Sequence, residues 1–207
     1  MSARDDVLAR IRSANASGAA PLAEVARDYA VAGDLAPGST EAVDLLVDRL
    51  VDYKATVTRT GPDDIRTAVD AALGDAARVV VPSGLDPQWV GSAERVLDDG
   101  SLTALDLDQL DGVVTAATVA CAVTGTIVLD GSADQGRRAI SLVPDLHVCV
   151  VRADQVVQTV PEMLARVEPT RPLTLISGPS ATSDIELERV EGVHGPRTLH
   201  VVIVAAD

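Results

Sequence analysis

A polar segment near the C-terminus, residues 178–196, holds most of the groups in this chain that could carry acid–base chemistry or bind a ligand. Its histidine, His194, lies between Val193 and a Gly-Pro pair, where a constrained loop could present a general acid or base with a pKa near neutrality. Asp184 and Glu186 are candidate carboxylate partners for that imidazole. The candidate ligand-binding residues of the segment are Gly178, Pro179, Ser180, Thr182 and Gly195.

The same segment also admits a structural interpretation. Ser183, followed three residues later by Glu186, fits the capping box that begins a helix, with Asp184 favourably placed in the first helical turn. His194 could equally lock its loop through a hydrogen bond. The capping box leaves residues 178–180 unexplained, and two nearby carboxylates weaken the binding of a phosphate. We therefore expect a neutral hydroxyl-bearing ligand, a metal-bridged ligand or a structural role.

Two earlier stretches add candidate ligand-binding residues. Residues 124–126 read Thr-Gly-Thr, whose hydroxyls could bind a ligand oxygen or simply close a turn around the glycine. Residues 131–138 form an acid-and-base loop of the length used for lids or partner contacts, and we expect it to be flexible. Its two adjacent arginines would point to opposite faces of a strand, so at most one of them clamps a carboxylate or phosphate. The candidates in these stretches are Thr124, Gly125, Thr126, Arg137 and Arg138.

Apolar segments that alternate with helical ones predict an α/β fold. Between residues 55 and 112 the alternation is typical of a mainly parallel sheet in a three-layer domain. Beyond Gly112 apolar stretches follow one another quickly, so we expect some antiparallel pairing there. Two strands, 173–176 and 199–204, are expected to hold the polar segment at one edge of a single sheet. Further strands are expected at 55–58, 78–81, 102–105, 113–114, 126–129 and 147–151, and helices at 63–73, 87–97 and 156–167.

The N-terminal part is expected to form a helical arm. Apolar residues recur at helical spacing over 7–11, and a second short helix is expected over 22–29. Residues 32–39 are the best candidate for a linker, and Ser39 could cap the helix that follows. These features divide the chain into an arm with its linker, residues 1–38, and an α/β domain, residues 39–207.

Composition argues against several classes of function. A formal net charge of −14 and an aromatic content of 1% disfavour both contact with nucleic-acid phosphates and base stacking. The N-terminus is charged and no apolar run of 18 residues occurs, so we expect a cytoplasmic protein that does not enter a membrane. Cys121 and Cys149 lie in separate apolar runs, and three scattered histidines offer no metal-site spacing. We therefore expect reduced core thiols and no bound metal.

Together these motifs resemble the lactate-utilisation protein C family, within the wider LUD-domain group. The likeness covers about residues 115–204 and is weaker upstream. In one departure, Val123 stands where the family commonly has an acidic residue before the Thr-Gly-Thr turn, which argues against catalysis by this chain alone. The resemblance is carried by TGTIVL at 124–129, RRAISLVPDLH at 137–147, ISGPSATSDIE at 176–186 and GVHGP at 192–196.

The resemblance implies a fold similar to that of the ribose-phosphate isomerase and CoA-transferase group, in agreement with the α/β pattern. It also implies a role in oxidising L-lactate to pyruvate alongside two iron-sulphur partner proteins. The chain has no cysteine motif for a cluster, so we expect it to bind no cofactor. It would then be an accessory subunit of that system, with a small hydroxy or keto acid as a candidate ligand.

Two other functions stay open from the sequence. A free-standing small-molecule enzyme, such as an isomerase or an acyl-transfer enzyme, would use His194 as acid or base with Asp184 or Glu186 as its partner. A sensor of a hydroxy acid would bind its ligand without converting it. A cavity that holds His194 within hydrogen-bond reach of a carboxylate would favour the enzyme.

Overall fold

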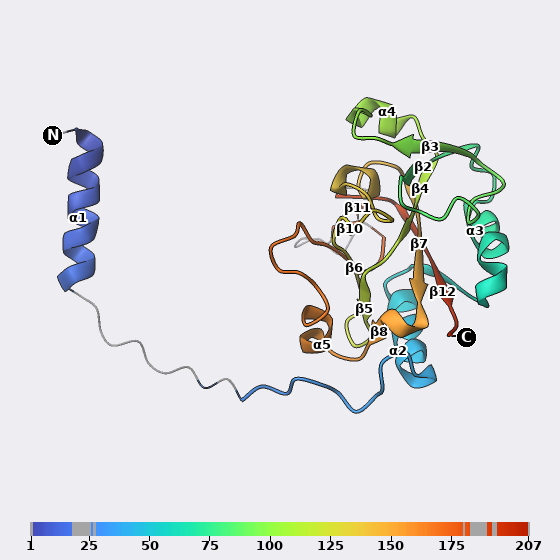
Figure 1. Cartoon of the computed structure of the whole chain (residues 1–207), viewed down its shortest axis with the longest axis horizontal. Coiled ribbons are helices and arrows are strands. Elements are labelled where there is room, and N and C mark those ends of the chain that lie inside the picture. The colour runs from blue at the N-terminus through green and yellow to red at the C-terminus, as the bar shows by residue number, and fades with distance from the viewer. Residues whose placement is uncertain are drawn as a thin grey trace. The chain divides into compact units, whose positions relative to one another are not determined.

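The computed structural model describes residues 2–17, 26, 28–179, 181–182, 190–191 and 194–206 of the 207-residue chain (Figure 1). It forms two compact units, Met1–Ala30 and Val31–Asp207. The first contains helix α1 (Ala3–Ser17), which agrees with the predicted helical spacing. The second helix predicted there lies mostly outside the described residues, and the described residues 28–30 at its end are not helical. Among the described helices, none is long and apolar enough to cross a membrane.

A six-stranded sheet forms the centre of the second unit (Figure 1). Every neighbouring pair of its strands runs parallel, as the alternation of strands and helices predicts. The strands read as runs of valine because a parallel sheet is buried on both faces. Their order across the sheet is β1 (Thr56–Thr60), β12 (Thr198–Val204), β7 (Leu146–Arg152), β4 (Gly112–Ala116), β2 (Arg78–Pro82) and β3 (Glu94–Asp98).

Two helices cover opposite faces of this sheet. Helix α2 (Thr40–Asp52) packs on the face that carries Cys149, and α3 (Ile65–Leu73) packs on the face that carries Val150. Successive residues of one strand face opposite sides, so these two neighbours in β7 mark the two faces. The Ser39 hydroxyl accepts a hydrogen bond from the backbone of α2 (3.2 Å), which confirms the predicted cap.

A second, four-stranded sheet lies on the same face as α2. Its residues Ala120 and Ile127 belong to the same buried cluster as Leu46 and Leu50 of α2. Two of its three strand pairings are antiparallel, which confirms the antiparallel pairing predicted beyond Gly112. The result is a three-layer α/β unit, as predicted. The strand order of the second sheet is β8 (Val156–Val157), β5 (Val119–Cys121), β6 (Thr126–Leu129) and β9 (Thr174–Ile176).

The polar segment 178–196 does not leave one edge of a single sheet, and that prediction is wrong. The strand before it, β9, belongs to the four-stranded sheet, whereas the strand after it, β12, belongs to the six-stranded sheet. Between them, β10 (Ala181–Thr182) and β11 (Val190–Glu191) form a short antiparallel pair. The segment therefore joins the two sheets.

Three further predictions of secondary structure are wrong. The last residues of the helix predicted at 87–97 instead form strand β3, which begins at Glu94. Its hydrogen bonds with β2 override the local helical pattern. The strand predicted at 102–105 is instead the start of helix α4 (Ala104–Asp108), which Thr103 caps. The helix predicted at 156–167 shrinks to α5 (Val160–Leu164), because a capping box at Thr159 delays its start.

Candidate functional site

The loop at residues 130–137 lies across the carboxyl ends of two central strands. The backbone of Gly84, just beyond β2, donates to the carbonyl of Ala133 (2.9 Å), and Ala116, the last residue of β4, donates to the carbonyl of Asp134 (3.0 Å). Strands β2 and β4 meet where the strand order of the sheet reverses, which is where open α/β sheets usually bind ligands. In this chain the loop covers that point.

Side chains hold the same loop in place. Gln135 is 3% exposed, and its amide accepts from the backbone of Asp130 (2.6 Å) and donates to Thr118 (2.8 Å). The carboxylate of Asp130 forms an ion pair with Arg171 (3.0 Å). These hydrogen bonds hold the loop against its neighbours, and the flexibility predicted for residues 131–138, with a role as a lid or in partner contacts, stays a prediction.

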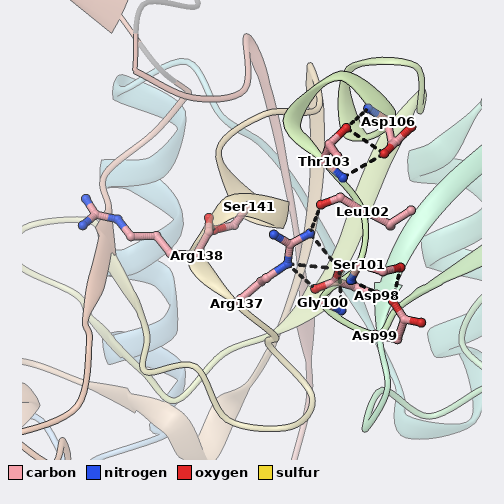
Figure 2. Close-up of polar contacts among 10 residues, drawn as sticks. All are labelled: Asp98, Asp99, Gly100, Ser101, Leu102, Thr103, Asp106, Arg137, Arg138 and Ser141. Atoms are coloured by element: carbon pink, nitrogen blue, oxygen red, sulfur yellow. Dashed lines mark hydrogen bonds and ion pairs between the residues drawn. The ribbon is translucent and has the colours of Figure 1, made fainter.

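The two adjacent arginines have different surroundings. Arg137 forms a fork with the buried carboxylate of Asp98, with Nε–Oδ2 and Nη2–Oδ1 distances of 2.9 Å, and Nη2 also donates to the carbonyl of Leu102 (2.6 Å). The hydrogen bond to Asp98 raises the pKa of Arg137. Figure 2 shows Arg138 pointing away from this fork. Arg138 is exposed and forms no ion pair within the described residues, so its charge, unlike that of Arg137, is not neutralised by a described partner.

Two cavities of about 240 and 420 Å³ lie in this part of the structure, and the loop lines the second of them. Ser141 and Thr174 line both, so the cavities adjoin. Polar groups face each of them, which is typical of a small-molecule site. The residues that line the first are Ser141, Leu142, His147, Thr174–Pro179, His194–Pro196 and Leu199. The residues that line the second are Ser83, Asp98, Gly100, Leu129, Gly131–Ala133, Gln135–Arg138, Ser141, Pro172 and Thr174.

The first cavity brings together four of the predicted site residues. Gly178, Pro179, His194 and Gly195 all line it, and Arg137 and Arg138 line the adjoining second cavity. Ser180, Asp184 and Glu186 lie outside the described residues, and only the backbone of Thr182, in β10, is described. Pairing of His194 with either carboxylate therefore stays a prediction. None of the described residues that line the first cavity is a carboxylate.

His147 lines the first cavity as well, although its sequence pattern indicates only a core or edge histidine. Its ring is 1% exposed, and its Nε2 lies 2.8 Å from the hydroxyl of Thr115 on the neighbouring strand β4. Burial lowers the pKa of His147 to about 4, so the ring is neutral at pH 7. Its position at the start of a buried strand was the only signal available in the sequence.

The Thr-Gly-Thr turn lies apart from both cavities and has a structural explanation. Gly125 has a φ of +60°, and a Cβ there would lie 2.9 Å from the Cβ of Arg49 in α2. The hydroxyl of Thr126 bonds those of Thr124 and Ser177, each at 2.8 Å. These contacts tie the turn to the start of the polar segment and support the turn interpretation. Ligand binding by Thr124, Gly125 and Thr126 stays a prediction, and none of the three lines either cavity.

Comparison with known proteins gives the family. Residues 41–204 match the LUD domain. The chain belongs to the LUD domain family. Lactate utilization protein C of Deinococcus radiodurans is 52% identical over 162 residues, which cover 76% of each protein. The Bacillus subtilis protein of the same name is 30% identical over 132 residues, which cover 60% of this chain and about half (53%) of that protein.

A solved structure supports the fold of this LUD domain. The crystal structure of a DUF162 family protein from Deinococcus radiodurans superposes with a TM-score of 0.70 at 40% sequence identity. The superposition covers 83% of this chain and 99% of that protein. The likeness agrees with the α/β class and the mainly parallel sheet predicted from sequence.

The two thiols of the LUD domain are poor candidates for chemistry. Cys121 and Cys149 are both free and buried. Burial raises the pKa of Cys149 to about 12, and the thiolate is the form that binds metals and attacks electrophiles. Within the part of the chain that the structure describes, no group of three His, Cys, Asp or Glu side chains is arranged to hold a metal ion.

We predict that Gly178→Ala destabilises the LUD domain by about 1–3 kcal/mol. Gly178 has a φ of +88°, and a Cβ there would lie 2.8 Å from the carbonyl oxygen of Tyr53 at the end of α2. Gly61→Ala is the matched control, because its φ is −81° and no atom lies within 4 Å of the added carbon. Urea denaturation measures the free energy of unfolding of both variants. Equal values for Gly178→Ala and Gly61→Ala would contradict this account.

We predict that Arg137→Gln lowers the free energy of unfolding by about 2 kcal/mol, because it leaves the Asp98 carboxylate, 4% exposed, without its charged partner. Arg152→Gln removes an exposed pair with Asp154 and should cost less than about 1 kcal/mol. Chemical denaturation at neutral pH distinguishes the two variants. If Arg137→Gln lowers the free energy of unfolding no more than Arg152→Gln does, the fork between Arg137 and Asp98 does not stabilise the fold.

We predict that His147 makes the LUD domain less stable as the pH falls from 6.5 to 4. Its folded-state pKa lies below its unfolded value, so its stabilising contribution is complete above pH 6.5 and is lost as the pH falls. In His147→Gln this component is absent, and the free energy of unfolding should fall less steeply over that range. His200→Gln is the comparison, because burial lowers the pKa of His200 as well but its ring is only half-buried, so its effect on the slope should be smaller. Parallel slopes for wild type and His147→Gln would contradict the prediction.

Proposed function

We propose that this chain is an accessory component of a cytoplasmic system that oxidises L-lactate to pyruvate, together with two iron-sulphur proteins. The observation that carries the proposal is the 52% identity, over 76% of both chains, to a protein named Lactate utilization protein C. A second protein of that name, from another organism, adds support. The iron-sulphur partners rest on the resemblance of the sequence motifs to that family.

An accessory role suits the chemistry of the described residues. Oxidising lactate removes electrons, and unmodified side chains do not carry them, so a redox cofactor has to take part. Iron-sulphur clusters are held by cysteine thiolates, whereas both cysteines of this chain are buried in its core. We therefore assign electron transfer to the partners, and the binding of substrate or product, or assembly of the system, to this chain.

A reconstituted system tests the proposal. We expect L-lactate-dependent reduction of an artificial electron acceptor by the two iron-sulphur partners to fall when this chain is omitted and to recover when it is added back. His194→Ala, in the first cavity, should lower the recovered rate, whereas His200→Gln, which lies in β12 and lines neither cavity, should not. A rate that is the same with and without the chain would refute the proposal.

A hydroxy-acid sensor is the second candidate, and the adjoining cavities are the observation that favours it. A sensor would show a rise in melting temperature with L-lactate or pyruvate but no turnover and no effect on the rate of the partner proteins. A free-standing isomerase or acyl-transfer enzyme would instead convert a substrate alone, with His194 as its acid or base.

A further inference from the structure

Two hydroxyl-bearing residues, Ser141 and Thr174, line both cavities. Ser141 is 2% exposed and donates to the backbone carbonyl of Arg138 (3.1 Å). Thr174 is 8% exposed, and its hydroxyl forms no hydrogen bond with another described residue. Among the described residues no buried polar side-chain atom lacks a partner, so the unbonded hydroxyl of Thr174 is accessible rather than buried. Thr174 therefore presents an unused donor and acceptor to whatever enters the cavities.

The second cavity has a local positive charge in a strongly acidic protein. Its described lining holds two guanidinium groups, Arg137 and Arg138, and one carboxylate, Asp98. Arg137 is paired with Asp98, so these two charges cancel and Arg138 leaves a balance of +1. The chain as a whole carries −14, which repels anions from most of the surface. A cationic group at the mouth of a cavity is therefore a local exception that favours an anionic ligand.

From these observations we infer that the joined cavities bind a small hydroxy or keto acid whose carboxylate pairs with Arg138 and whose hydroxyl or carbonyl oxygen hydrogen-bonds Thr174. Arg137 is a positioning residue, because its fork with Asp98 fixes the backbone from which Arg138 extends (Figure 2). The guanidinium of Arg138 suits the binding of a carboxylate, because its planar donors match the two carboxylate oxygens.

The charge balance favours a carboxylate over a phosphate. One unpaired guanidinium neutralises a monoanion, whereas a phosphate dianion would keep an excess negative charge close to the carboxylates of Asp98 and Asp130. The described lining of both cavities contains no Phe, Tyr or Trp, so a nucleobase would have only the imidazoles of His147 and His194 to stack on. The polar groups within the lining, which include Ser132, Gln135 and Ser177, offer hydrogen-bond partners to the oxygen atoms of a hydroxy or keto acid.

This inference deepens the proposed function by naming the anchor for the acid, but the two can fail separately. Binding that depends on Arg138, together with a lactate oxidation rate that does not need the chain, would refute the proposed function and keep the site. A rate that needs the chain but no binding of any acid would refute the site and keep the function.

Isothermal titration calorimetry on the isolated full chain tests the site, with L-lactate, pyruvate, glycolate and inorganic phosphate as separate probes. We expect at least one of the organic acids to bind, with a Kd that rises about tenfold or more in Arg138→Gln, as for a lost charged hydrogen bond. Thr174→Val should weaken binding of the same acid. Circular dichroism establishes that each variant is folded.

Arg78→Gln is the matched control. It removes the same charge from the first residue of β2, while the second cavity lies beyond the other end of that strand, and it should leave the Kd within about twofold. If Arg138→Gln and Arg78→Gln weaken binding of the acid equally, the assignment is overturned. The change in Kd would then come from the net charge of the protein and not from a contact with Arg138. Absence of binding by all three acids would overturn it too. If phosphate binds more tightly than any of the acids and its binding depends on Arg138 in the same way, the ligand of this site is a phosphate and the carboxylate assignment is wrong.

Discussion

The attachment of loop 130–137 to the carboxyl ends of β2 and β4 is the constraint on which the candidate site depends. Backbone hydrogen bonds from Gly84 and Ala116, and the buried amide of Gln135, hold the loop at this position. The loop covers the point where the strand order reverses, which is where open α/β sheets usually bind ligands. It lines the second cavity, and the fork between Arg137 and Asp98 fixes one wall.

Helix α2 supports the other side of the site. The Thr-Gly-Thr turn packs on Arg49, and the start of the polar segment packs on Tyr53, each through a glycine at a positive φ. The hydroxyls of Thr126 and Ser177 then join the two loops. A turn that looks like a ligand-binding motif in the sequence is therefore part of the scaffold, and it fixes the strand end from which the first cavity is lined.

The sequence predicts the interior of this fold well and its edges less well. The valine runs of β2 and β7 are buried on both faces and carry an unambiguous signal. Strand β3 has a partner on one side only, and it mixes charged with apolar residues, so its local pattern resembles a helix. The separation of β9 and β12 into different sheets depends on pairing between distant residues, which periodicity does not reveal. For the same reason, the roles of Arg137 and Arg138 could be separated only once Asp98 was placed beside one of them.

The different roles of these two arginines are the central claim, and arginine side-chain NMR tests it directly. In an Nε–Hε spectrum recorded during a titration with pyruvate or L-lactate, we predict that the Arg137 signal is visible without ligand, exchanges slowly with water and does not move. The Arg138 signal should shift and sharpen as ligand binds. A shift of the Arg137 signal with no change at Arg138 would contradict the account, because it would make Arg137 the ligand anchor and its fork with Asp98 a pair that opens.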